Sequence, residues 1–262
     1  MNVKCLASSS AGNCFIMELD VNGETTRIMV ECGLAIGEIY SKLSAYGILL
    51  SSIKACLITH AHQDHCKSAN KISSLNIPVF ASKDTLEAIS CKGNELLLEK
   101  PNRILNGVFV FPFKVEHDID GAVGFIIKTA KECILFVNDH KKWDIDLSNF
   151  KPDYVFIECN YDHQIVYPQI YSLKRRRENQ NLSDQEIKEI NISLKQNERN
   201  VNSHCSLKGT MMGLHKLNLS YCQAIFLMHL SDRYANEYKM KNTIQTEFGI
   251  RTYVCKKDGG IK

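Results

Sequence analysis

Thr59-His60-Ala61-His62-Gln63-Asp64-His65 is the stretch of this 262-residue chain that decides its fold. It carries three imidazoles and one carboxylate, and it directly follows a short apolar run of strand type, Ala55 to Ile58. Because side chains alternate between the two faces of a strand, His60 and His62 are expected to project to the same side. Asp64 and His65 come after the strand and can point at a second position. The spacing therefore predicts ligands for two metal ions.

The pattern His60-x-His62-x-Asp64-His65 resembles the H-x-H-x-D-H signature of the metallo-β-lactamase superfamily. The resemblance covers nearly the whole chain and implies an α/β fold, a four-layer αββα sandwich with the metals at one edge. Because the expected ligands run from His60 to His229, we expect one domain over residues 1–262. Helical patterns are predicted over residues 37–46, 82–90 and 232–248, with Ser82 as the N-cap of the second.

The superfamily's other ligands each follow a strand, and the chain has a candidate for each. His117 stands between two apolar runs, in the place of the third ligand of the first metal. Asp139 ends an apolar run in the place of the bridging carboxylate, although His140 beside it differs from the family pattern and could intrude on the site. His229 ends the run 225–228 in the place of the second metal's last ligand. The resemblance thus implies the ligand set His60, His62, Asp64, His65, His117, Asp139 and His229.

Such a ligand set indicates hydrolytic chemistry. Neutral imidazoles and ionised carboxylates suit Zn²⁺ and Mn²⁺. Two such cations about 3.5–4 Å apart lower the pKa of a shared water towards neutrality and stabilise charge on the attacked centre. We therefore expect two divalent metal ions and a hydroxide held by them, with Asp64 taking part in the catalytic centre.

Further motifs narrow the resemblance to nucleases. Residues 156–162 resemble the Glu-x-Asn-His-Asp segment of the YycJ-like (WalJ) branch, with Tyr161 where that branch often has His. Residues 203–206, Ser-His-Cys-Ser, resemble its Gly-His-Leu-Ser. Residues 228–234 resemble the His-x-Ser-x-Arg-Tyr of the tRNA 3′-processing endonucleases (RNase Z). The likeness implies a phosphodiester substrate.

The same relatives imply a proton-transfer pair. In those endonucleases a Glu and a later His beside the metals are thought to carry a proton to the leaving alkoxide, and Glu158 and His204 occupy the matching positions. Phosphodiester cleavage needs such a donor because the departing sugar oxygen is a poor leaving group. An alternative is that Glu158 binds a basic side chain and His204 stands at the start of a helix.

The amino-terminal strands also follow the family pattern, with one departure. Residues 8–13, Ser-Ser-Ser-Ala-Gly-Asn, resemble the Gly-Ser-Ser-Gly-Asn opening of the YycJ-like branch. The next strand normally ends in Asp-x-Gly, where the Asp orients a ligand His, but here Glu31 replaces it. One extra methylene is expected to alter a contact that commonly matters about 10–100-fold for metal affinity or activity.

A polar stretch departs from the family pattern. Ser183-Asp184-Gln185-Glu186 reads as a capping box, so we expect a helical insertion at about residues 178–202. The basic run at its base is expected to contact substrate phosphates, although such a run is commonly a solvated turn. This run consists of Lys174, Arg175, Arg176 and Arg177.

Composition sets broad limits on partners and compartment. The net charge is only +3, so any grip on nucleic acid must come from local patches. The eleven cysteines are scattered singly without a C-x-x-C pair, which favours a reducing compartment over disulfides. An apolar signal core and a membrane-length apolar run are both missing, so we expect a cytoplasmic protein without a membrane partner.

The leading hypothesis is a dinuclear metal-dependent phosphodiesterase that acts on DNA or RNA. The first alternative is hydrolysis of a small phosphodiester such as a cyclic nucleotide, which the weak net charge would permit. A second is a thioester or lactam hydrolase in which Glu158 and His204 are idle. A third is a binding module that keeps the metal ligands for structure alone.

Overall fold

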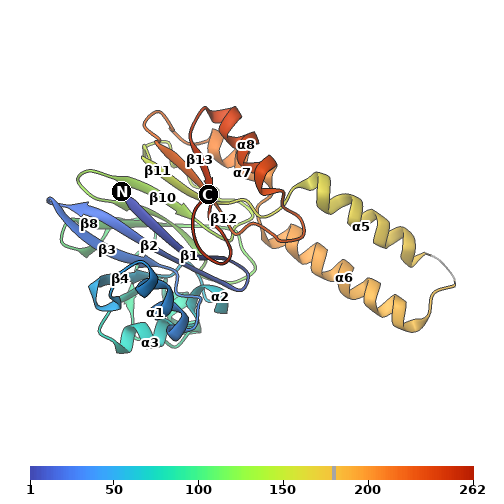
Figure 1. The fold of residues 1–262 in the computed structure, drawn as a ribbon, viewed down its shortest axis with the longest axis horizontal. Coiled ribbons are helices and arrows are strands. Elements are labelled where there is room, and N and C mark those ends of the chain that lie inside the picture. Colours follow the sequence, from blue (N-terminus) through green and yellow to red (C-terminus); the bar gives the residue numbers. More distant parts are fainter. Residues whose placement is uncertain (179–180) are drawn as a thin grey trace.

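The structure, a computed structural model, describes residues 1–178 and 181–262 and contains two mixed β-sheets packed face to face (Figure 1). The first sheet has the order β1-β2-β3-β4-β5-β6, and the second the order β13-β12-β11-β10-β9-β8-β7. The strands are β1 (Asn2–Ser9), β2 (Gly12–Val21), β3 (Glu24–Val30), β4 (Ile53–Leu57), β5 (Val79–Ala81), β6 (Asn94–Glu95), β7 (Asn102–Leu105), β8 (Val108–Lys114), β9 (Val123–Lys128), β10 (Cys133–Val137), β11 (Tyr154–Glu158), β12 (Ala224–Met228) and β13 (Thr252–Val254).

Helices cover the outer face of each sheet, and two further helices project from the sandwich. They are α1 (Ile36–Ala45), α2 (Gln63–Cys66), α3 (Ala69–Ser74), α4 (Lys83–Ala88), α5 (His163–Arg177), α6 (Asp184–Ser203), α7 (Leu207–His215) and α8 (Glu237–Phe248), with a short 3-10 turn at Leu50–Ser52. Apolar residues of α1 and α3 pack on the first sheet, and those of α7 and α8 on the second. A third core lies between the sheets, where Phe156 stacks on Phe226 at 4.3 Å between ring centroids. The predicted four-layer αββα sandwich is confirmed.

The predicted helices differ from the observed ones mainly at their ends. The Ser82 side chain accepts a hydrogen bond from the Thr85 N–H, so Ser82 is the N-cap of α4 as expected. The helix expected from residue 232 begins only at Glu237, because the Asn236 side chain caps it by accepting from the Lys239 N–H. Among the described residues, no helix is long and apolar enough to cross a membrane.

Parallel pairing brings the ends of several strands to one edge of the sandwich. β10, β11 and β12 are parallel neighbours in the second sheet, and β4 lies parallel to β3 in the first. Asp139, Glu158 and His229 therefore lie at or just beyond the carboxyl ends of adjacent strands, and His60 follows β4. Residues that are distant in sequence meet here because the sheet order requires it.

Helices α5 and α6 form an antiparallel arm that projects from the sandwich (Figure 1). The capping box of Ser183 and Glu186 starts α6 as predicted, whereas residues 179–180 of the expected insertion lie outside the described residues. The arm is larger than expected because α5 begins at His163. The assignment of the arm as an insertion in a single domain stays a prediction.

The basic run does not lie where it was expected. Lys174, Arg175, Arg176 and Arg177 form the last turn of α5, at the outer end of the arm rather than at its base (Figure 1). Lys174 pairs with Glu198 and Arg176 with Glu186, both on α6. Two of the four charges therefore connect the helices of the arm.

Candidate metal centre

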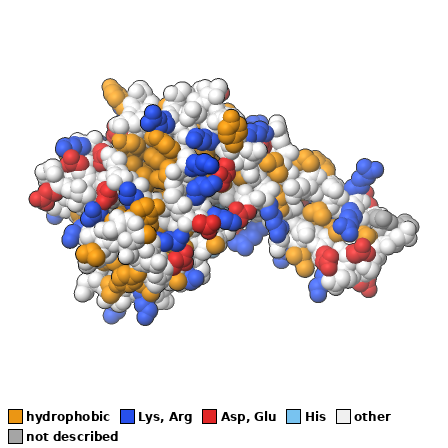
Figure 2. Space-filling view, in the orientation of Figure 1, with side chains coloured by type: hydrophobic (Ala, Val, Ile, Leu, Met, Phe, Trp, Pro, Cys, Tyr) orange, Lys and Arg blue, Asp and Glu red, His pale blue; other side chains and the backbone are white. Residues whose placement is uncertain are grey.

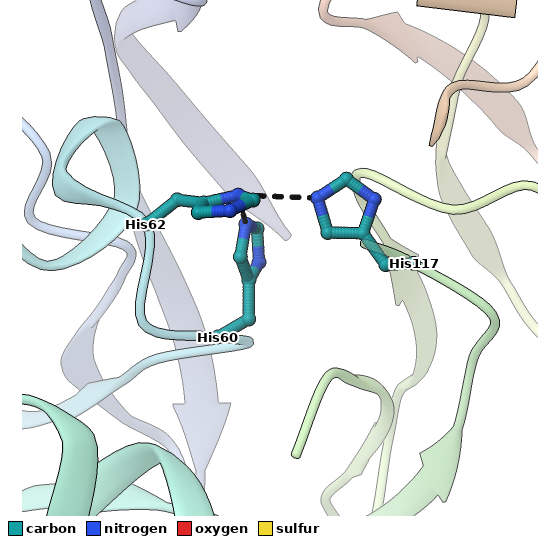
Figure 3. Close-up of side chains that lie close together, drawn as sticks. All are labelled: His60, His62 and His117. Atoms are coloured by element: carbon teal, nitrogen blue, oxygen red, sulfur yellow. Dashed lines mark hydrogen bonds between the residues drawn. The ribbon is translucent and has the colours of Figure 1, made fainter. Parts of the chain in front are cut away.

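Three histidines form the first group of candidate metal ligands. His60 and His62 follow β4, and His117 lies in the loop between β8 and β9 (Figure 3). Nε2 of His60 lies 3.1 Å and Nε2 of His117 3.2 Å from Nδ1 of His62. Tetrahedral zinc with Zn–N bonds of about 2.0–2.1 Å sets neighbouring ligand atoms about 3.4 Å apart. The separations of these three nitrogens are thus close to those of ligand atoms around a single zinc ion.

A second group lies beside the first. Oδ2 of Asp64 and Oδ2 of Asp139 lie 3.3 and 3.4 Å from Nε2 of His65, and Nε2 of His229 lies 3.8 Å from Oδ2 of Asp64. Oδ2 of Asp139 is also 3.9 Å from Nε2 of His117 in the first group. Asp139 therefore lies between the two groups, as a bridging carboxylate would.

Polar groups behind the rings fix their orientation. His60 Nδ1 lies 2.9 Å from the Thr59 hydroxyl, which itself donates to Glu31. His117 Nδ1 lies 2.9 Å from the carbonyl oxygen of Ser203, the last residue of α6. Because Nδ1 of each ring is held from behind, Nε2 points into the centre. Such partners set the tautomer and direction of a ligating imidazole.

Backbone geometry places the second group. Glu31 and His229 have φ of +63° and +55°, a left-handed conformation that is uncommon for residues other than glycine and often found at functional sites. A Cβ at Gly33 would lie 1.7 Å from the carbonyl oxygen of Asp64, so only glycine allows α2 to approach this closely. Asn13 also binds that carbonyl, with its Nδ2 donating at 3.3 Å.

The charges of the centre favour bound cations. Burial would lower the pKa of His229, but the carboxylates of Asp139, Asp64 and Glu158 raise it to about 10. Burial also opposes a charge on His65, yet Asp139 and Glu31 hold its pKa well above the usual value. Among the described residues, His229 Nε2 and Asp139 Oδ1 are buried without a hydrogen-bond partner. The donor atoms and their negative surroundings fit divalent cations.

Glu158 and His204 meet beside these groups. Nδ1 of His204 lies 2.6 Å from Oε1 of Glu158, whose Oε2 accepts from the backbone N–H groups of His140 and Cys205. Burial would raise the pKa of Glu158, but His204 lowers it to about 2. The His140 ring packs on Trp143 and belongs to none of the groups of candidate ligands among the described residues. The Nδ1 atom of this ring lies 3.6 Å from Oε2 of Glu158, so His140 contacts the pair from behind rather than joining the candidate ligands.

The centre opens into a cavity of about 330 Å³, which reaches α6. Its lining includes Arg199 and other residues of α6, together with residues of the centre: His62, Asp64, Asp139, His204 and His229. Arg199 Nη2 lies 3.2 Å from Oδ2 of Asp118, and Oδ1 of Asp118 lies 3.2 Å from Nε2 of His117. A guanidinium is thus held at the entrance by a carboxylate that touches a candidate ligand.

The structure brings together most of the residues predicted for the site. All seven candidate ligands converge, Glu31 lies behind His65, and Glu158 contacts His204. The basic run of residues 174–177 is not among the described residues that line the cavity. Sequence reasoning assigned no site role to several residues that the structure places here: Asn13, Thr59, Asp118, Asn160, Arg199 and Ser203.

Comparison with known proteins identifies the fold. The structure resembles the metallo-β-lactamase fold protein YhfI from Bacillus subtilis, with a TM-score of 0.69, 13% identity and coverage of 99% of this chain and 97% of the other. It also resembles Zn²⁺-bound PqqB from Methylobacterium extorquens, with a TM-score of 0.65, 12% identity and coverage of 100% of this chain and 99% of the other. The short form of human tRNase Z is similar as well, with a TM-score of 0.58, 16% identity and coverage of 89% of this chain and 94% of the other. The chain has the metallo-β-lactamase fold.

One sequence relative and a scan of family models add to this comparison. The chain is 28% identical over 144 residues to ribonuclease J from Sinorhizobium meliloti. The match covers 48% of this chain but only 25% of that ribonuclease, so the chain spans a small part of its relative. No family model matches the chain.

Proposed function

We propose that the chain is a metal-dependent phosphodiesterase that acts on nucleic acid. The observation that carries the proposal is the position of Asp139 between two groups of converging donor atoms, in a cavity that is also lined by His204, the partner of the buried Glu158. His60, His62 and His117 would hold one divalent cation, Zn²⁺ or Mn²⁺. Asp64, His65 and His229 would hold a second, with Asp139 shared.

Two cations bound there would make a water acidic enough to attack at neutral pH and would offset charge on the phosphate. The protein contributes fixed orientation. Thr59 and the Ser203 carbonyl hold the rings of His60 and His117, and Gly33 allows Asp64 to approach the site. Because these partners are buried or belong to the backbone, the donor atoms need little rearrangement on binding.

Glu158 and His204 supply what the leaving group needs. Glu158 accepts from Nδ1 of His204 and raises the pKa of that imidazole against the effect of burial, which favours a second proton at Nε2. His204 lines the cavity, where its Nε2 proton can pass to the departing sugar oxygen. A substrate with a poor leaving group would make use of this pair, which favours a phosphodiester over a lactam or thioester.

The relatives support nucleic acid as the substrate. Two proteins similar to this chain bear the names tRNase Z and ribonuclease J. The fold itself hosts several chemistries, so the fold alone does not choose the substrate. The choice rests on the His204 and Glu158 pair together with these names.

The test is metal-dependent degradation of end-labelled single- and double-stranded DNA and RNA by the purified protein loaded with Mn²⁺ or Zn²⁺. Asp64→Ala, prepared in parallel, excludes a contaminating nuclease. Shortened products with the wild type alone would support the proposal, and their lengths would separate exonucleolytic from endonucleolytic cleavage. Intact oligonucleotides together with hydrolysis of cyclic nucleotides would replace it with the small-phosphodiester alternative.

A further inference from the structure

Helix α6 has two faces with different partners. Its inner face packs against α5 and the body through Ile190, Leu194 and Asn197, which are all buried. The Asn197 side chain accepts a hydrogen bond from the hydroxyl of Tyr234, which fixes the arm to the loop after β12. The position of α6 relative to the sandwich is therefore set by buried contacts.

The outer face of α6 is basic. Lys188, Ile192, Lys195 and Arg199 follow the spacing i, i+4, i+7 and i+11, which places them on one side of a helix. All four are exposed, with Arg199 at 70% of its side chain and Ile192 at 49%. With a rise of about 1.5 Å per residue, this row is about 16 Å long.

The inner end of this row is at the metal centre. Arg199 lines the cavity together with Gln196 and Asn200 of the same helix. Its guanidinium pairs with Asp118, which lies beside His117 and His62. A ligand that follows α6 towards the sandwich would therefore arrive at the candidate ligands.

Of the four acidic residues of α6, Asp184 lies one turn before Lys188 on the same side, and the other three lie off the row. Glu186 and Glu198 pair with Arg176 and Lys174 of α5, so their charges are offset on the far side of the helix. Glu189 accepts a hydrogen bond from Gln185 one turn before it. In Figure 2 basic side chains, drawn in blue, occur at several places along the arm. The arrangement leaves the lysines of the outer face available to an anion.

We propose that the row Lys188, Ile192, Lys195 and Arg199 binds the sugar-phosphate backbone of a single nucleic-acid strand and leads it into the cavity. The inference rests on the proposed function and adds the surface that receives the substrate. A cavity of about 330 Å³ at the end of the row admits one strand rather than a base-paired duplex. Arg199 would release Asp118 and pair with a phosphate, for which a guanidinium is well suited.

The test compares Lys188→Gln/Lys195→Gln with a matched control, Lys71→Gln/Lys92→Gln, which removes the same charge from the α3 side of the molecule. Binding of fluorescein-labelled phosphorothioate single strands, DNA and RNA, is measured by anisotropy with the metal-loaded protein at several salt concentrations. The α6 variant is expected to bind about five- to tenfold more weakly, and the slope of log K against log salt should fall by about 1.4. The control should match the wild type.

Three outcomes would overturn the inference. If the α6 variant binds with wild-type affinity and still cleaves, the row is not the binding surface, and the proposed function is unaffected. A third variant, Arg175→Gln/Arg177→Gln, tests the last turn of α5. If only this variant binds more weakly, the binding surface lies at the end of α5 and not on α6. If the wild type neither binds nor cleaves any oligonucleotide with metals loaded, the proposed function fails and the inference fails with it.

Discussion

Oε1 of Glu31 lies 3.2 Å from Nδ1 of His65, and both side chains are fully buried. The same oxygen accepts a hydrogen bond from the Thr59 hydroxyl at 2.5 Å, and that hydroxyl lies behind His60. One carboxylate therefore orients a ring in each group of candidate ligands. The longer side chain of Glu, in place of the Asp in the superfamily pattern that the sequence resembles, reaches both partners.

Glu31→Asp is expected to weaken divalent metal binding about 10–100-fold, because a shorter side chain cannot keep both contacts. Aspartate tolerates the left-handed conformation at this position, so the backbone should be preserved. Competition with a fluorescent zinc chelator measures the affinity. Glu38→Asp, at an exposed position of α1, is the control. Unchanged affinity in Glu31→Asp would show that the carboxylate does not orient the ligands.

Metal stoichiometry distinguishes the two groups of ligands. Asp64→Ala should lower the bound metal from about two ions per chain to one or fewer, and His62→Ala should do the same through the other group. Elemental analysis of the purified proteins by mass spectrometry gives the ratio. Asp120→Ala removes an exposed carboxyl near the centre and should keep both ions. Retention of two ions by Asp64→Ala would contradict its role as a ligand.

His204→Ala should lower turnover of an oligonucleotide about 10²–10⁴-fold while the metal content stays unchanged. The loss should be much smaller for a chromogenic diester that releases a nitrophenolate, because a good leaving group needs no proton. Single-turnover rates for both substrates provide the comparison. An equal loss on the two substrates would assign His204 to a structural role.

The candidate ligands could be picked out from the sequence because four of them form one short motif, His60 to His65, and the other three each follow an apolar run. Their partners could not. The Ser203 carbonyl behind His117 is a backbone group without a sequence signal, and Arg199 reaches Asp118 only because α6 packs back against the cavity entrance. The basic run was placed at the wrong end of the arm, because charge patterning does not reveal the direction in which a helix leaves the body.

The arm is also fixed to the body by an ion pair at its base. Asp162 is the N-cap of α5 and binds Nζ of Lys239 on α8 at 2.6 Å. Burial would raise the pKa of Asp162, but Lys239 and the Gln164 N–H hold it below the usual value. Since the pKa is lower in the folded protein, the charged carboxylate stabilises the fold above the unfolded pKa of about 3.9. This contribution is lost as the pH falls through the folded value.

Asp162→Asn keeps a side chain that can cap the helix and removes only the charge. We expect it to lower the Tm at pH 7 by about 1–3 °C, because Lys239 is partly exposed and the pair is worth at most about 1 kcal/mol. The difference from the wild type should narrow as the pH falls below about 3.9, and it should vanish below the lower folded pKa, where the wild-type carboxylate is also neutral. Thermal unfolding followed by circular dichroism gives the Tm difference at each pH from about 2.5 to about 7, a range that extends about one unit or more on either side of pKa 3.9. Asp120→Asn is the charge-matched control. A difference that stays constant over this range would mean that the ion pair does not stabilise the arm.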